Sequence, residues 1–275
     1  MIGWHHARGG VAAAAPAPPK RRGGRSAPEI VRFCPRDPDA IRPPPVAGDA
    51  WQAALQEAPD RHERLDDRGV DTLLTALGDF VDLKCPFTLG HSRAVAALAG
   101  DAAAAAGLDA AAVALTRRAG HVHDLGRIGV SNQIWSKAGP LTAGEFERVR
   151  LHPYLTVRIL SQVRGLAQVA QLAGNHHECL DGSGYPRGLP DSALGLPDRV
   201  LAAAVAYQSG CEPRPYREAF TPASAARRLH ARVRAGHLDP VAVEAGAAAG
   251  RPHPAPPPGP PARLPPRAGR GCAAP

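Results

Sequence analysis

The sequence predicts an all-α fold, a helical bundle between two tails that do not fold. Apolar residues recur at helical spacing through the middle of the chain, and no run alternates apolar and polar residues long enough to form a convincing strand. Aromatic residues make up only 4% of the 275 residues, so alanine, leucine and valine must build the core. The 30 prolines are concentrated towards the two ends, and both they and the 29 glycines exceed average usage.

The two ends of the chain are predicted to be disordered. Residues 1–48 mix glycine, proline, arginine and alanine without periodicity, and they contain too little apolar surface to fold. Residues 251–275 are rich in proline and arginine. We therefore expect one domain over residues 49–250. A truncation or a shifted reading frame after about Arg251 would explain the composition of the last segment.

The periodicity predicts a succession of helices between these tails. Asp109 is expected to cap one of them, and Thr142 with Glu145 forms a capping box that opens another. Residues 181–196 contain four glycines and two prolines and are expected to form a long ordered loop. The predicted helices begin near Trp51 and continue through 73–81, and then cover 91–107, 110–124, a segment from 142, 154–163, 165–178, 198–209, 222–235 and 239–249.

The net charge of +8 belongs to the tails. Residues 1–36 contain seven lysines or arginines and one acid, and residues 251–275 contain four arginines and no acid, so the rest is slightly acidic. Nucleic-acid binding through these tails ranks last among the functions considered, because they contain few aromatic residues and any phosphate attraction would be non-specific. We expect no specific nucleic-acid partner.

Cysteine usage and hydropathy favour a cytoplasmic protein. The five cysteines form no CxxC pair, which is neither a disulfide framework nor a zinc-finger spacing. The longest apolar stretches are far shorter than the ~20 residues of a membrane span, and the weak apolar run near the N-terminus lacks the features of a signal peptide. We therefore expect no membrane association.

Histidines carry the chemical signal of this sequence. Among the 12 histidines, five in the helical middle are the candidate ligands, and Asp124 directly follows one of them. Imidazole and carboxylate together suit a divalent transition metal. Any single histidine is more often an ordinary core or surface residue, but an adjacent buried pair without partners is costly. The five are His91, His123, His152, His176 and His177.

The order of these residues resembles the HD superfamily of metal-dependent phosphohydrolases. The string HDLGRIGV from His123 is similar to the HD motif and its extension, and NHHECLDGSGYP from Asn175 is similar to the signature of the HD-GYP subfamily. The segments KAGPLT from Lys137 and RPYR from Arg214 also fall where that family has equivalents. The resemblance covers about residues 70–249 and rests on several ordered motifs.

The resemblance implies a helical bundle that binds two divalent metal ions, usually iron or manganese, and hydrolyses cyclic di-GMP or a related phosphoester. One ion would be held by His91, His123 and Asp124, and the other by His152, His176 and His177, with Asp124 bridging. Arg127 would contact the phosphate, and Asp124 and Arg127 are the expected catalytic residues. The substrate loop and further phosphate contacts would come from Gly182, Gly184, Tyr185, Pro186, Arg214 and Arg217.

The pattern departs from the family at three positions. Val205 stands where the family supplies a further aspartate ligand, so the first site loses a charged oxygen, which water or Gln208 could replace. Phe87 stands where some relatives have a glutamate, so no third metal is expected. Gly210 weakens its helix by about 1 kcal/mol relative to alanine.

Two functions remain open at this point. The first is a dinuclear phosphodiesterase, impaired or not by Val205. The second is a catalytically degenerate module that binds a nucleotide or a signalling partner without turnover, which Val205 favours. Metal content discriminates between them, because the enzyme needs both sites filled.

Overall fold

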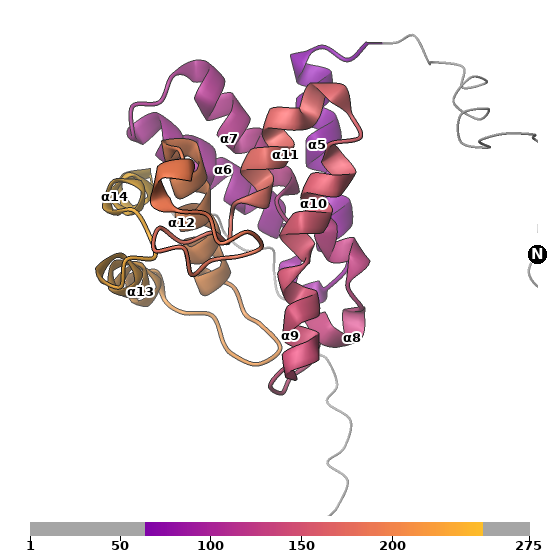
Figure 1. Ribbon diagram of the computed structural model, residues 1–275, viewed down its shortest axis with the longest axis vertical. Helices are drawn as coiled ribbons and strands as arrows, with labels where there is room; N and C mark the ends of the chain where they lie inside the picture. Colours follow the sequence, from indigo (N-terminus) through magenta and orange to yellow (C-terminus); the bar gives the residue numbers. More distant parts are fainter. Residues whose placement is uncertain (1–63, 250–275) are drawn as a thin grey trace, which may run out of the picture. The chain divides into compact units, whose positions relative to one another are not determined.

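The computed structural model describes residues 64–249, and α-helices dominate them (Figure 1). No strand forms within these residues, where the one β-bridge joins Arg214 to Arg217. The predicted all-α class is therefore confirmed. The tails, the helix expected near Trp51 and the domain boundary at residue 49 lie outside the described residues. The elements are α5 (Asp67–Asp82), η1 (Pro86–Thr88), α6 (His91–Ala105), α7 (Ala110–Val122), η2 (Leu125–Gly129), α8 (Asn132–Trp135), α9 (Ala143–Arg150), α10 (His152–Leu160), η3 (Arg164–Leu166), α11 (Ala167–Gly174), η4 (Asp191–Ala193), α12 (Leu196–Cys211), α13 (Pro222–Arg234) and α14 (Pro240–Ala249).

Local sequence signals account for several helix ends. The Asp109 carboxylate accepts a hydrogen bond from the Ala112 backbone N–H and caps α7, as predicted. Thr142 and Glu145 form the predicted capping box of α9. Gly210 lies inside α12, which continues to Cys211 in spite of the propensity cost.

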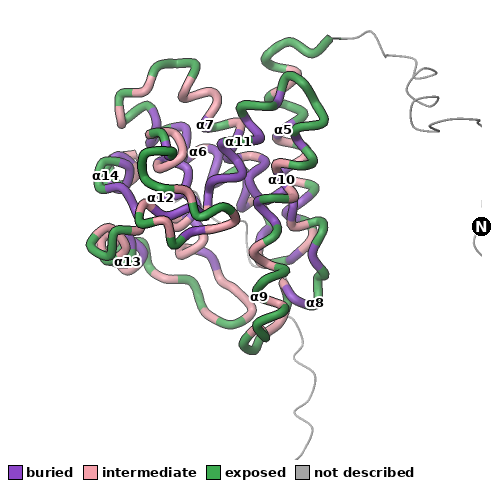
Figure 2. Tube along the Cα trace, viewed as in Figure 1, coloured by how far each residue is buried: buried purple, intermediate pink, exposed green. Residues whose placement is uncertain are grey.

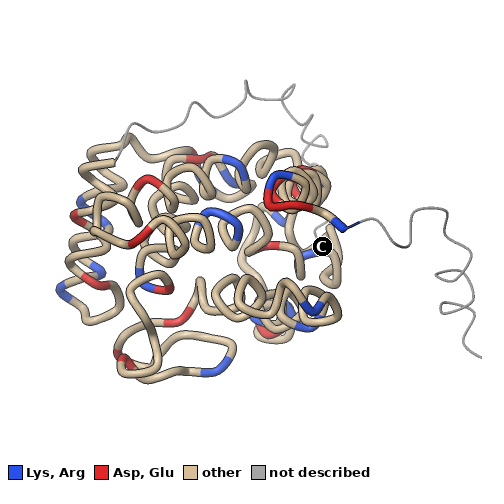
Figure 3. The backbone as a smooth tube through the Cα atoms, turned by 90° about the horizontal axis from the view of Figure 1, so that it is seen from above, with Lys and Arg blue, Asp and Glu red and all other residues tan. Residues whose placement is uncertain are grey.

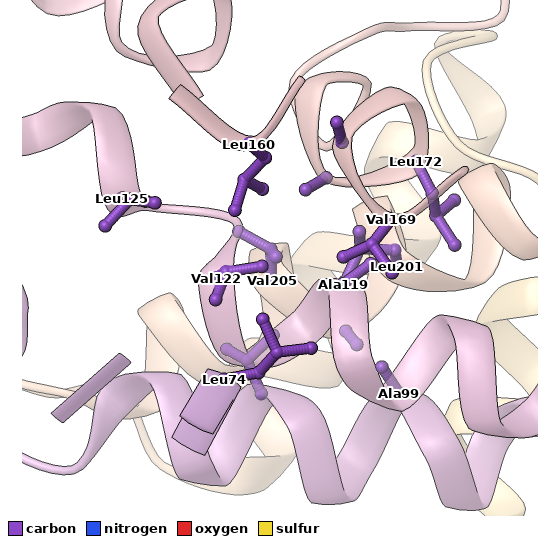
Figure 4. Packing of buried hydrophobic residues seen from close by; sticks show 14 of the residues in the cluster. Leu74, Ala99, Ala119, Val122, Leu125, Leu160, Val169, Leu172, Leu201 and Val205 are labelled. Atoms are coloured by element: carbon purple, nitrogen blue, oxygen red, sulfur yellow. The ribbon is translucent and has the colours of Figure 1, made fainter. Parts of the chain in front are cut away.

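Two apolar clusters share helices α6 and α12. The first joins these two helices to α5, α7, α10 and α11, and the second joins them to α13 and α14. Figure 2 shows the buried segments gathered in α6, α7, α11 and α12, with the exposed segments on the outer loops and helix faces. Leu74 and Leu201 are fully buried in the first cluster (Figure 4). Truncating either to alanine is expected to cost roughly 2–5 kcal/mol.

Charged residues of both signs are interspersed over the helices in the view of Figure 3. Several of them pair across the surface, as Arg118 does with Asp67 and Asp71. Exposed pairs of this kind contribute at most about 1 kcal/mol each. No helix among the described residues is both long and apolar enough to cross a membrane.

Candidate metal centre

The six candidate ligands all lie at or beside helix ends. His91 and His152 are the first residues of α6 and α10, and His123 follows the last residue of α7. His176 and His177 lie just beyond the end of α11. All except the part-exposed His177 are buried, and Asp124 is only 6% exposed. The fold therefore brings four separate helix ends to one interior point.

Free carbonyls at helix C-termini orient three of the imidazoles. The last carbonyls of an α-helix have no partner within the helix. Nδ1 of His123 lies 2.9 Å from the Gly120 carbonyl, and Nδ1 of His176 lies 2.6 Å from the Ala173 carbonyl. Nδ1 of His152 lies 2.6 Å from the Val149 carbonyl at the end of α9. Since a carbonyl only accepts, each Nδ1 carries the proton and each Nε2 presents its lone pair inward.

Asp124 lies at the centre of these lone pairs. Its Oδ2 is 3.6 Å from Nε2 of His123 and 3.9 Å from Nε2 of His91. Its Oδ1 is 3.3 Å from Nε2 of His152 and 3.8 Å from Nε2 of His176. One carboxylate oxygen thus faces each group of histidines.

Protonation does not explain this crowding of lone pairs. Burial lowers the pKa of His123 from 6.5 to about 4, and burial together with neighbouring histidines lowers the pKa of His176 well below 6.5. Nε2 of His152 and Nε2 of His176 are nevertheless only 3.1 Å apart. Nε2 of His123 is buried without any hydrogen-bond partner. Neutral imidazoles in this arrangement need a cation to share.

The donor set fits two divalent cations. In each of two triads, the donor atoms lie within 4.8 Å of one another. The triads are His91, His123 and Asp124, and His152, His176 and His177. Imidazole nitrogens with a shared carboxylate suit transition metals such as iron and manganese. Although burial favours the neutral acid, Arg127 and His123 hold the pKa of Asp124 well below its ordinary value, so the carboxylate is ionised.

Gly126 allows the two triads to approach. A Cβ atom at this position would lie 1.9 Å from the His152 carbonyl oxygen and 2.6 Å from the Thr156 backbone nitrogen. The Thr156 hydroxyl accepts from the Gly126 N–H at 2.8 Å and donates to the His123 carbonyl at 2.9 Å. These contacts fix η2 against α10 and place Asp124 beside His152.

The loop after His177 is fixed by a buried carboxylate. Glu178 accepts hydrogen bonds from the backbone N–H groups of Arg187 and Leu189 at 2.8 and 3.0 Å. A Cβ atom on Gly184 would lie 2.3 Å from the Cys179 backbone nitrogen, so only glycine fits this close approach. The fold stacks the Tyr185 ring on His177 at a centroid distance of 4.6 Å.

A cavity of about 320 Å³ opens on the histidine cluster. Arg127 lies in its wall, donates to Asp124 Oδ2 at 2.8 Å and stacks on Trp135 at 4.0 Å. Lys137, Tyr185, Arg214 and Arg217 line the same cavity. Gly182, Gly184 and Pro186 are not among the residues that line it.

The two arginines of the RPYR segment differ in what they bind. Arg217 donates to four backbone carbonyls, those of Ser209, Gly210, Glu212 and Glu218. Arg214 donates to the Phe87 carbonyl at 2.7 Å and to the Glu212 carboxylate at 2.9 Å. In this conformation Arg217 holds the turn together.

Val205 packs against apolar side chains and also lines the cavity, together with His91 and Asp124. It is 5% exposed and belongs to the first apolar cluster, near Val122 (Figure 4). Gln208, one turn later, is buried and donates its amide to Glu212 at 2.8 Å. Gln208 therefore faces a carboxylate and does not stand in for the aspartate that the family pattern would place at Val205.

Two residues at this centre were missed by sequence analysis. Glu212 contacts His91, and Trp135 supports Arg127. Neither belongs to a motif, and Trp135 lies in a helix of only four residues. The position of Glu212, two residues before Arg214, was the only available hint.

Helical packing around buried histidines and a shared aspartate defines a class of protein, the all-α metal-binding domains. The chain belongs to the HD domain family, whose model matches residues 75–241, and within that family to the HD-GYP subfamily.

Curated relatives support this assignment. The chain is 39% identical over 159 residues to the 3'3'-cGAMP-specific phosphodiesterase 3 of Vibrio cholerae serotype O1, a match that covers 58% of this chain and 35% of that protein. It is 36% identical over 150 residues to the cyclic di-GMP phosphodiesterase response regulator RpfG of Xanthomonas campestris pv. campestris, which covers 54% and 39%. The chain thus spans less than half the length of these relatives.

One solved structure shares the fold. An HDG"Y"P protein from Bdellovibrio bacteriovorus superposes with a TM-score of 0.51 at 16% identity, over 72% of this chain and 66% of that one.

Proposed function

We propose that the chain is a metal-dependent phosphodiesterase that hydrolyses a cyclic dinucleotide, cyclic di-GMP or a related phosphoester. The observation that carries the proposal is the convergence of four imidazole Nε2 atoms on the two oxygens of Asp124. Cations stabilise an arrangement so rich in lone pairs, and the cavity beside it gives a phosphoester access.

In the proposed centre, His91, His123 and Asp124 hold one ion and His152, His176 and His177 hold the other. Iron and manganese are the expected metals. Two such ions supply Lewis-acid activation of a phosphoryl group and of the water that attacks it. The carbonyl contacts of Nδ1 keep the histidines oriented for this, because they fix the tautomer of each ring.

Basic side chains in the cavity are proposed to bind the phosphate. Arg127 donates one hydrogen bond to Asp124, and its guanidinium stacks on Trp135. These two contacts hold the side chain where its other donors reach the cavity. Arg214 and Lys137 lie in the same wall, where Arg214 is paired with Glu212 and Lys137 with Glu145. Arg217 is proposed to act on the phosphate only through its charge, because its donors are bound to carbonyls.

The glycine-rich loop is proposed to shape the substrate side of the centre. Gly182, Gly184 and Pro186 set its path, and Tyr185 presents an aromatic face against which a base can stack. The names of the relatives, which specify cyclic di-GMP and 3'3'-cGAMP, support a cyclic dinucleotide substrate.

The test is hydrolysis of cyclic di-GMP and of 3'3'-cGAMP by the full chain loaded with Mn²⁺ or Fe²⁺. We expect linear products by chromatography and a loss of at least about 100-fold in the His176→Ala variant. His230→Ala, on helix α13 away from the centre, is the matched control and should retain the activity. A metal-loaded protein that cleaves neither compound would contradict the proposed substrate.

A second function is favoured by one observation, the apolar packing of Val205. Without the aspartate, the first triad holds a single carboxylate, and the chain could act as a regulator that binds a nucleotide or a signalling partner. Activity that is absent in the natural chain and present in Val205→Asp would support this second function. Activity in both would exclude it.

A further inference from the structure

Glu212 contacts the outer nitrogen of His91. This glutamate directly follows α12 and is 5% exposed, and its Oε2 lies 2.8 Å from Nδ1 of His91. The contact is close but lacks the alignment of a hydrogen bond, so its attraction is mainly electrostatic. The other ring nitrogen, Nε2, faces Asp124. Glu212 therefore lies behind the imidazole, with the proposed metal site in front of it.

The Glu212 carboxylate is itself held in place. Its Oε1 accepts from the Gln208 amide at 2.8 Å, and its Oε2 accepts from Arg214 at 2.9 Å. Arg214 is anchored in turn on the Phe87 carbonyl.

His91 differs from the other oriented histidines in this respect. His123, His152 and His176 donate Nδ1–H to a backbone carbonyl three residues earlier. His91 is the first residue of α6 and follows only the three-residue turn η1, and no backbone carbonyl accepts a hydrogen bond from its Nδ1. A carboxylate from the far end of α12 takes that place. A carboxylate behind a metal-binding imidazole raises the basicity of the ring and fixes its orientation.

We infer that Glu212 is the positioning residue of the first triad, where it holds His91 towards the metal and supplies the negative charge that Val205 does not. The inference rests on the proposed metal centre. It predicts that one of two metal sites depends on Glu212, because backbone carbonyls orient His152 and His176 in the second triad.

The test is metal binding, measured independently of turnover. The metal-free full chain is titrated with Mn²⁺ by calorimetry and with Co²⁺ by visible absorption. We expect Glu212→Gln, which keeps the shape and removes the charge, to weaken one site about 10–100-fold and leave the other unchanged. The Co²⁺ absorption of the weakened site should shift, and Glu212→Asp, which keeps the charge, should restore part of the affinity.

Asp239→Asn is the matched control. Asp239 is also a buried carboxylate paired with an arginine, Arg199, but it caps α14 and lies outside the centre. This variant should lower stability and leave both metal affinities unchanged.

Three results would overturn the inference or its basis, and they are distinguishable. Two metal ions bound equally by the natural chain and by Glu212→Gln would refute the role of Glu212 alone. Equal weakening of both sites with loss of helical circular dichroism in Glu212→Gln and Glu212→Asp alike would show a purely structural role and refute it too. A natural chain that binds no metal would refute the proposed centre itself.

Discussion

Acid should destabilise the metal-free protein, because its centre buries neutral histidines. The perturbation is removal of metal with a chelator followed by a change from about pH 7.5 to about pH 5.5. His123 has a pKa of about 4 in the folded chain against 6.5 ordinarily, and burial also holds the pKa of His176 well below 6.5. Below pH 6.5 the unfolded chain therefore binds protons that the folded chain does not. Stability must fall as the pH falls.

The magnitude follows from these shifts. One pH unit below 6.5, each histidine that stays neutral in the folded state costs about 1.4 kcal/mol, so His123 and His176 together cost roughly 3 kcal/mol. Asp82 acts in the opposite direction, because burial raises its pKa from 3.8 to about 6 and the folded chain takes up its proton first. That uptake offsets about 1 kcal/mol at the same pH. The expected net loss from these three groups is roughly 2 kcal/mol, a large part of a typical stability of about 5–15 kcal/mol. His177, whose pKa burial also holds well below 6.5, acts in the same direction and adds to the loss.

Urea denaturation of the chelated protein at the two pH values measures this loss directly. Asp82→Asn removes the offsetting group, so its loss between the two pH values should grow to roughly 3 kcal/mol. His123→Asn should reduce the loss by about 1.4 kcal/mol. A free energy of unfolding that stays constant or rises on acidification would refute the assignment of neutral, buried imidazoles.

Three further perturbations probe separate parts of the centre. Gly126→Ala should lower the free energy of unfolding by about 3 kcal/mol in thermal or urea denaturation, because its Cβ would lie 1.9 Å from the His152 carbonyl oxygen. An unchanged free energy of unfolding would mean that η2 and α10 are not packed this closely. Val205→Asp should destabilise the metal-free protein by about 2 kcal/mol, because it places a carboxylate against an apolar cluster. The same variant should raise the metal affinity of one site at least about 10-fold in calorimetry. If neither site bound metal more tightly, the ligand position would lie elsewhere. Arg127→Ala should leave the metal content of the protein intact and lower kcat/KM on cyclic di-GMP on the order of 100-fold. If the variant lost both its metal and its activity, the role of Arg127 would instead be to hold Asp124 in place.

The all-α class was predictable because the apolar periodicity is long and the strand pattern is absent. Helix ends were less predictable where tertiary contacts decide them. The predicted helix 165–178 ends at Gly174 in the structure, since the following residues turn inward to bring His176 to the centre. The predicted helix 110–124 ends at Val122 and continues as the 3-10 turn η2, which packs on α10 through Gly126.

The candidate ligands were named from motif order, which carries no information about their surroundings. Spacing alone could not reveal that helix-end carbonyls orient His123, His152 and His176, because all three carbonyls belong to helices whose predicted ends were misplaced or unspecified. Nor could it separate Arg214 from Arg217, which are three residues apart and differ only in the partners that the turn gives them.

The centre therefore depends on two kinds of support with different tolerance to mutation. Backbone carbonyls orient His123, His152 and His176, and no side-chain substitution removes a carbonyl, so those orientations persist while the helices persist. His91 depends on a side chain, Glu212, and on the residues that hold that side chain. Side-chain substitutions can therefore disturb the orientation of His91 more readily than that of His152 or His176. Val205 lies on α12, and Glu212 directly follows the end of that helix. The orientation of His91 therefore depends on Glu212, the carboxylate that follows α12, since Val205 within that helix supplies none.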